Sequence, residues 1–169
     1  MIIRDMTVSD ARRVAEIHTR AWQVAYEGIL PSSVLDNINL EERVEMWRDT
    51  IIPMPNRDNI VLEEDGALLG WAAHGPSRDD DKDHAATREL YGIYINPDRF
   101  RHGYGRMLWA EVLKRMSIHE YLETTLWVLE ENGRARGFYE KMGFELDAGI
   151  SRKVDWLGGA VEVRYTRQT

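Results

Sequence analysis

The stretch that decides the fold is Glu89-Leu-Tyr-Gly-Ile-Tyr-Ile-Asn-Pro-Asp-Arg-Phe-Arg-His-Gly-Tyr-Gly-Arg106. Its first part is rich in aromatic and β-branched residues, which predicts a strand that ends at Asn96-Pro97. Apolar residues then recur at helical spacing from about Gly103 to Met116. Between the two elements, Gly103 and Gly105 allow backbone torsions and close approaches that a side chain would forbid. The stretch therefore predicts a strand, a glycine-containing turn and the start of a helix.

The turn is a candidate anion site. The first amide protons of a helix lack partners within it, and the helix dipole places positive charge at the same end. Arg99, Arg101 and Arg106 add cations to a chain of net charge −7, so a diphosphate would suit the turn. A dinucleotide fingerprint is absent, because Leu108 stands where its third glycine belongs, and no G-x-x-x-x-G-K-[ST] loop occurs. Taken alone, the two glycines fit a structural turn equally well.

Composition excludes several classes of protein. The chain has 169 residues, 43% hydrophobic and 30% charged, which is the profile of one globular domain rather than a collagen-like or disordered protein. Without cysteine, it has no disulfide, thiolate zinc site or Cys nucleophile. The negative charge disfavours nucleic acid and acidic membranes as partners. Early charges at Arg4 and Asp5, and the lack of a long apolar run, favour a cytoplasmic location.

The rest of the chain predicts a mixed α/β domain. Helices are expected over residues 8–26 and 33–52, the second broken near Asn39 and ended by Pro53 and Pro55. Thr7 and Asp10 have the spacing of a capping box. Further elements are strands at 60–62 and 68–73 around an Asp65-Gly66 turn, strands at 124–129, 144–146 and 161–165, and a helix at 133–142. The charged run at 77–84 lacks metal-ligand spacing, so we expect a solvated loop and no metal site.

A second pattern, N-x-x-A-x-x-x-Y-x-x-x-G-F, is matched at every position by Asn132, Ala135, Tyr139, Gly143 and Phe144. With the turn, which fits [QR]-x-x-G-x-[GA] except at Phe100, it resembles the GNAT superfamily of N-acetyltransferases. The resemblance is strong over residues 89–144 and looser in the first third, around residues 22–28. It implies a single-domain GNAT fold over residues 1–169. In that fold, a mixed and mostly antiparallel sheet is flanked by helices, and its central strands splay to form the acetyl-coenzyme A cleft.

The resemblance also implies roles for individual residues. The backbone of Ile93, Tyr94 and Ile95 would pair with the pantetheine arm like an added strand. The pyrophosphate would lie against Arg101, His102, Gly103, Tyr104, Gly105 and Arg106. Asn132 would contact the cofactor from the other wall, unless it is only a helix N-cap. His18, Trp22 and Tyr26 share one face of the first helix and would line the acceptor pocket, unless they belong to the core.

Two side chains are expected to handle protons. Glu89 takes the general-base position, but a Glu pKa of about 4.3 lies far below the ~10.4 of an alkylammonium. Glu89 therefore needs pKa tuning or a water relay, and otherwise it is a charged strand end. Tyr139 takes the general-acid position beside the departing thiolate, or it is a packing aromatic. A backbone amide near Ile93 or Ile95 would stabilise the thioester oxygen.

Together these residues predict an enzyme that moves an acetyl group from acetyl-coenzyme A to a primary amine of a small molecule, peptide or protein. Direct attack is expected, because neither a cysteine nor a G-x-S-x-G elbow is available for a covalent intermediate. The alternatives are a non-catalytic module that senses acyl-coenzyme A, a different acyl donor, or a hydroxyl acceptor. Exposed Trp and Tyr side chains would permit a homodimer.

Overall fold

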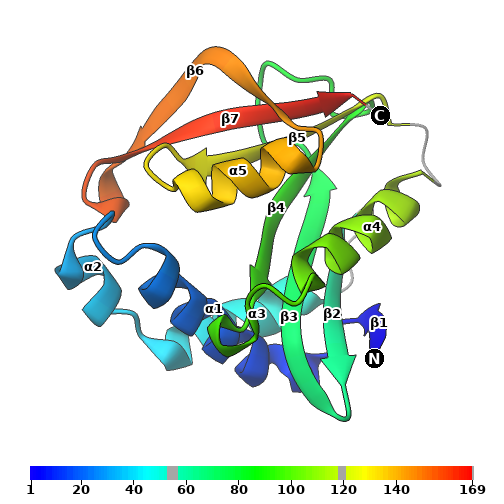
Figure 1. Cartoon of the computed structure of the whole chain (residues 1–169), viewed down its shortest axis with the longest axis vertical. Coiled ribbons are helices and arrows are strands. Elements are labelled where there is room, and N and C mark those ends of the chain that lie inside the picture. Colours follow the sequence, from blue (N-terminus) through cyan, green and yellow to red (C-terminus); the bar gives the residue numbers. More distant parts are fainter. Residues whose placement is uncertain (53–56, 118–120, 169) are drawn as a thin grey trace.

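A seven-stranded sheet with the order β1-β2-β3-β4-β5-β7-β6 forms the centre of the molecule (Figure 1). The computed structural model describes residues 1–52, 57–117 and 121–168. The strands are β1 (Ile2–Asp5), β2 (Asp58–Glu64), β3 (Ala67–Pro76), β4 (Thr87–Ile95), β5 (Glu123–Leu129), β6 (Glu145–Val154) and β7 (Ala160–Gln168). Every neighbouring pair is antiparallel except β4 and β5, which are parallel. The expected mixed, mostly antiparallel sheet is confirmed.

Helices cover both faces of the sheet: α1 (Ala11–Ala25), α2 (Ser32–Asp36), α3 (Leu40–Ile51), α4 (Tyr104–Met116) and α5 (Gly133–Lys141). Successive residues of a strand point to opposite faces, and β2 shows the result. Its Ile60 and Leu62 pack in the core beneath α4, whereas Val61 packs in the core beneath α1 and α3. Figure 1 shows α4 and α5 on the near side of the sheet. The continuous apolar runs of β2 and β3 therefore reflect burial on both faces.

The sheet is divided at its middle. β4 pairs with β5 only between Thr87–Glu89 and Glu123–Thr125, after which the two strands diverge. Beyond that point β4 stays with β3, and β5 stays with β7. The V-shaped opening between the strands is the cleft that the resemblance implied, and it leaves one edge of β4 without a partner strand.

Local signals in the sequence are confirmed in detail. The Thr7 amide donates to the Asp10 carboxylate at 2.8 Å, as a capping box requires. Asn39 interrupts the second helical stretch because its side-chain oxygen accepts from the Glu41 and Glu42 amides and so caps α3. Pro53 and Pro55 lie outside the described residues.

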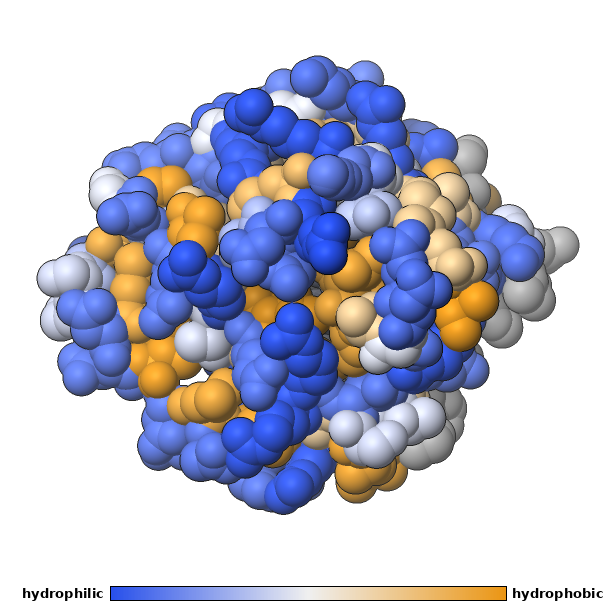
Figure 2. Space-filling model, turned by 60° about the horizontal axis from the view of Figure 1, so that its bottom comes forward, coloured by the Kyte–Doolittle hydropathy of each residue, from blue (hydrophilic) through white to orange (hydrophobic). Residues whose placement is uncertain are grey.

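The edge strand β6 is longer than the sequence predicts. It extends to Val154, well beyond the predicted 144–146, and Gly149 and a register shift between Leu146 and Ser151 interrupt it. On the face in Figure 2, hydrophobic side chains lie in separate patches between hydrophilic ones. None of the helices within the described ranges is long and apolar enough to cross a membrane.

Candidate active site

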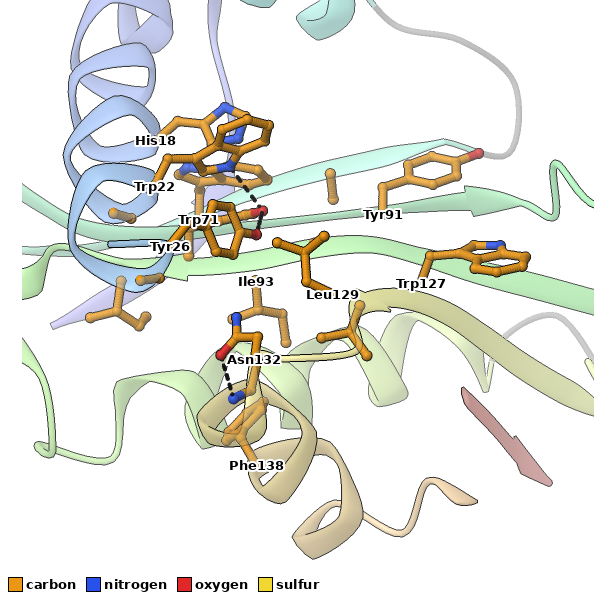
Figure 3. A pocket seen from close by; sticks show the side chains of 18 of the residues that line it. His18, Trp22, Tyr26, Trp71, Tyr91, Ile93, Trp127, Leu129, Asn132 and Phe138 are labelled. Carbon is orange, nitrogen blue, oxygen red and sulfur yellow. Dashed lines mark hydrogen bonds between the residues drawn. The ribbon is translucent and has the colours of Figure 1, made fainter. Parts of the chain in front are cut away.

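A cavity of about 1090 Å³ opens where β4 and β5 diverge. Ile93 of β4 and Leu129 of β5 lie at its middle, with Asn132 and Phe138 of α5 below them (Figure 3). Aromatic side chains of α1 close one end, and Tyr91 and Trp127 lie toward the other. The cavity thus extends from the turn before α4, across the open edge of β4, to the layer formed by α1 and α3.

The open edge of β4 offers backbone hydrogen bonds to a ligand. The Asn96 amide donates to the Leu69 carbonyl of β3 at 2.8 Å. Since amides alternate in direction along a strand, those of Ile95 and Ile93 point toward the cleft. The register shift between Ala73 and His74 leaves Tyr91 as an extra residue of β4, and such a bulge redirects the strand at this point. Ile93, Tyr94 and Ile95 all line the cavity.

The turn before α4 is built for close approach by an anion. Gly103 is the N-cap of α4 with φ 82°, and Arg101 also has a positive φ of 68°. A Cβ on Gly105 would lie 3.2 Å from the Phe138 ring of α5, so this glycine makes room for that ring at the start of α4. Arg101, Gly103, Tyr104, Gly105 and Arg106 line the cavity together with Arg99, whereas His102 lies outside its lining. The structure therefore brings together every predicted residue of this turn except His102.

Arg134 is a cation of this region that the sequence patterns did not reveal. Its guanidinium lies 3.8 Å from the centre of the Phe100 ring, at the position where the turn departs from its pattern. Burial and the neighbouring charge of Arg101 lower the pKa of Arg134. Two guanidinium groups held near one another favour an anion between them. Arg134 stands at a variable position of the second pattern, between Asn132 and Ala135, so the pattern gave no reason to single it out.

Asn132 and Tyr139 reach the cavity from α5. The Asn132 side-chain oxygen accepts from the Ala135 amide at 3.1 Å, so the residue is an N-cap and keeps its amide nitrogen for a ligand. Tyr139 packs edge-on against Phe138 and Phe144. Burial, with a smaller contribution from Tyr94, raises the pKa of Tyr139. Its phenol is therefore protonated at neutral pH and available as a donor.

The predicted acceptor residues form one aromatic wall. Trp22 donates from its indole nitrogen to the Tyr94 hydroxyl at 3.1 Å, and the Tyr26 hydroxyl lies 3.1 Å from the same oxygen. His18 packs against Trp22 and Tyr94, with ring centres 5.4 and 4.8 Å away. Figure 3 shows His18, Trp22 and Tyr26 together beside the cavity. The side chain of Tyr94, predicted only for its backbone, therefore belongs to this wall as well.

His18 is a neutral member of that wall. Burial, followed by the charge of Arg43, lowers the pKa of His18 well below its ordinary value. The Trp47 indole donates to His18 Nδ1 at 3.3 Å, which assigns the proton to Nε2. An imidazole with its basic nitrogen already engaged is a poor proton acceptor.

Glu89 does not face the cavity directly. Its side chain is buried, and Arg78 covers it with a backbone amide at 2.9 Å and with side-chain contacts from Nε and Nη2. Pairing with Glu89 raises the pKa of Arg78. Arg78 itself lines the cavity, as does Arg57, and sequence reasoning singled out neither. Within the described ranges, no group of His, Asp and Glu side chains could hold a metal ion.

Comparison with known proteins places this chain in a family. The model of the acetyltransferase (GNAT) family matches residues 12–144. The chain belongs to this family. The acetyltransferase is 28% identical over 130 residues to the uncharacterized N-acetyltransferase YuaI of Bacillus subtilis, covering 77% of this chain and 72% of that protein. It is 24% identical over 149 residues to a spermidine N(1)-acetyltransferase of Thermoplasma acidophilum, covering 86% and 88% of the two chains.

The same architecture occurs in a solved structure. The PaiA N-acetyltransferase from Thermoplasma acidophilum, crystallised with coenzyme A, superposes with a TM-score of 0.81 at 20% identity. The match covers 99% of this chain and 98% of that one. Such a likeness establishes the GNAT fold of this acetyltransferase and confirms the expected fold class.

Proposed function

We propose that this GNAT protein transfers the acetyl group of acetyl-coenzyme A to a primary amine of a small molecule or of a peptide or protein. The observation that carries the proposal is the cavity itself. It joins an open strand edge, a cationic helix N-terminus and a protonated tyrosine in one continuous space. The coenzyme A bound in the PaiA relative supports the same choice of donor.

The cavity suits acetyl-coenzyme A along its length. The Ile93 and Ile95 amides would pair with the pantetheine arm, as in strand addition. Arg101, the Gly103–Arg106 backbone and the added cations Arg99 and Arg134 would hold the phosphates. The Asn132 side-chain nitrogen would donate from α5. When bound, the cofactor supplies the acetyl group as a thioester.

The transfer forms one bond and breaks another. The amine nitrogen attacks the thioester carbonyl carbon, so a C–N bond forms as the C–S bond breaks, the amine gives up a proton and the departing sulfur takes one. An amide of β4 facing the cleft stabilises the charge on the carbonyl oxygen. The Tyr139 hydroxyl donates a hydrogen bond to the sulfur. Since burial raises the pKa of Tyr139, a strengthening hydrogen bond suits this role better than full proton transfer.

The proton of the amine needs a separate acceptor. Neutral His18 has its basic nitrogen engaged by Trp47. Glu89 lies behind Arg78 and not in the cavity lining. We therefore propose that Glu89 accepts the amine proton through a chain of water molecules rather than by direct contact with the amine. The chain has no cysteine that could carry an acyl intermediate, which favours direct attack by the amine.

The test is release of free thiol from acetyl-coenzyme A in the presence of a panel of primary amines, each compared with the corresponding alcohol. We expect thiol release above the enzyme-free background with amines and not with alcohols. Longer acyl-coenzyme A donors, tested on the best amine, decide the acyl preference. Binding of acetyl-coenzyme A without thiol release from any amine would contradict transferase activity and favour a sensing module.

A further inference from the structure

One part of the cavity is lined by arginines and aromatic rings. We call this part the α3 lobe: Trp47 and Trp71 line it beside His18, and Arg57 and Arg78 line it beside Tyr91, toward the other end. Trp47 and Trp71 pack edge-on with ring centres 4.6 Å apart, and Tyr91 packs against the same core cluster. The described acids that line the cavity, Asp155 and Glu162, belong to the β6–β7 side instead. The α3 lobe therefore offers apolar surface and positive charge, and no described carboxylate lines it.

Arg57 is the cation of this lobe whose charge is least compensated. Its Nε is buried, and no described residue provides a hydrogen-bond partner for it. Its guanidinium carbon lies 5.1 Å from the centre of the Tyr91 ring, and that of Arg78 lies 4.7 Å from the same centre. Arg78 is paired with Glu89, but no ion pair within 4.0 Å joins Arg57 to a described carboxylate. A buried N–H without a partner is costly, and an oxyanion from a ligand would satisfy it and balance the charge of the guanidinium.

Three aromatic rings of the cavity lining, those of Trp22, Tyr91 and Trp127, already have one of the chain's own guanidinium groups over a face. Arg43 lies 4.7 Å above the Trp22 ring, and Arg152 lies 4.0 Å above the Trp127 ring. Arg57 and Arg78 lie over the Tyr91 ring in the same way. A polyamine or quaternary ammonium would need such ring faces and acidic side chains. Here the chain's own arginines occupy a face of each of these three rings.

From this arrangement we propose that the acceptor is an amine that also carries a carboxylate, held by Arg57 with Arg78 beside it at the Tyr91 ring. The proposal rests on the proposed acetyltransferase function and names its substrate class. It separates this enzyme from its spermidine-acetylating relative, whose named substrate is a polycation. Arg57 is then a specificity-determining residue, because its planar fork matches a carboxylate.

The experiment measures thiol release from acetyl-coenzyme A with a series of amino acids in which the distance between amine and carboxylate increases. Each amino acid is compared with its own carboxamide, and the series is compared with spermidine. A charge-assisted contact predicts a kcat/KM roughly tenfold or more higher for the best acid than for its amide. Arg57→Gln should reduce that ratio to about threefold or less, because kcat/KM for the acid falls through a higher KM. Arg48→Gln is the matched control, since Arg48 lies on exposed α3 surface outside the cavity lining.

The outcomes are distinct. Equal use of acid and amide by the wild type, or a preference for spermidine, would overturn the proposal whether or not the Arg57 variant folds. A variant that keeps the full acid preference would also overturn the role of Arg57. An absence of thiol release with every amine, charged or neutral, would instead contradict the proposed function on which this inference rests.

Discussion

Tyr139 presents the most direct test at the scale of one residue. If its hydroxyl steadies the departing sulfur, the contact strengthens only as charge develops there, so it belongs to the transition state. Tyr139→Phe keeps the ring that packs against Phe138 and Phe144. We expect kcat and kcat/KM to fall together by roughly 10²–10⁴-fold, with little change in acetyl-coenzyme A affinity.

Single-turnover rates are the appropriate measurement, because slow product release would hide a slower chemical step. The comparison substitution is Phe138→Leu, which alters a ring of the same cavity wall without touching a hydroxyl. A Tyr139→Phe rate within about threefold of wild type in the chemical step would assign the residue to packing.

The sequence indicated which single residues would line the cavity, but not which side chains would pair with one another. The spacing placed Tyr139, Asn132 and the Gly103 turn, and all of them reach the cavity. It could not show that Arg78, eleven positions before Glu89, would cover that carboxylate. Such a pairing depends on the β3–β4 register, which no short window of sequence contains.

At the scale of elements, the turn between β4 and α4 carries the next prediction. Gly103 has φ 82°, and a Cβ added to it would meet no atom within 4 Å. A side chain there would therefore disturb the backbone torsion and the approach of a ligand, rather than crowd its neighbours. In the wild type, acetyl-coenzyme A at 100 times its Kd should stabilise the fold by about 2.7 kcal/mol. NAD and ATP at equal concentration should do little.

Gly103→Val should abolish that ligand-induced rise in Tm. Gly149→Val is its matched control, since Gly149 has φ 81° and open space around it but lies on β6, outside the cavity lining. The control should lose some basal stability and keep the full shift. A folded Gly103→Val protein with unchanged acetyl-coenzyme A affinity would place the anion site elsewhere.

The elements themselves were largely predictable, and the reasons are local. Helices α1, α3, α4 and α5 could be predicted from the spacing of their apolar residues. Asn39 is a residue type that favours the N-cap position, and it caps α3. β6 was underestimated because Gly149, with φ 81°, and a register shift between Leu146 and Ser151 interrupt the strand. Arg57, Arg78 and Arg134 were missed because their importance comes from rings contributed by other elements, Tyr91 and Phe100.

At the scale of the whole molecule, charge is distributed unevenly. The chain has a net charge of −7, yet Arg57, Arg78, Arg99, Arg101, Arg106, Arg134, Arg152 and Lys153 line the cavity, with Asp155 and Glu162 as the described acids there. An acidic surface with a basic interior cleft attracts anions only where the cleft opens. The net charge of the chain therefore gives no sign of this basic cleft.

Global stability should also depend on the cavity wall, through His18. Its pKa is lowered below the ordinary value of 6.5 by burial and by Arg43. Above that value His18 is neutral in both the folded and unfolded states, and it contributes no pH dependence. As the pH falls through 6.5, His18 binds a proton in the unfolded chain but stays neutral in the folded chain. The free energy of unfolding therefore decreases on acidification, by at most about 1.4 kcal/mol per pH unit from this residue.

Urea unfolding at pH 7.5 and 5.0 measures the effect when wild type is compared with His18→Gln. Gln cannot titrate, so the variant should lose less stability between the two pH values, by an upper limit of about 2 kcal/mol. The quantity compared is the change in unfolding free energy between the two pH values, in wild type and in the variant. A loss of packing in the variant affects both pH values equally, and the other titrating groups affect both proteins equally, so neither changes this difference. A variant that loses as much stability as wild type would mean that His18 accepts its proton in the folded state. The aromatic wall would then hold an imidazolium, and His18 would have to be reconsidered as a proton acceptor in the transfer.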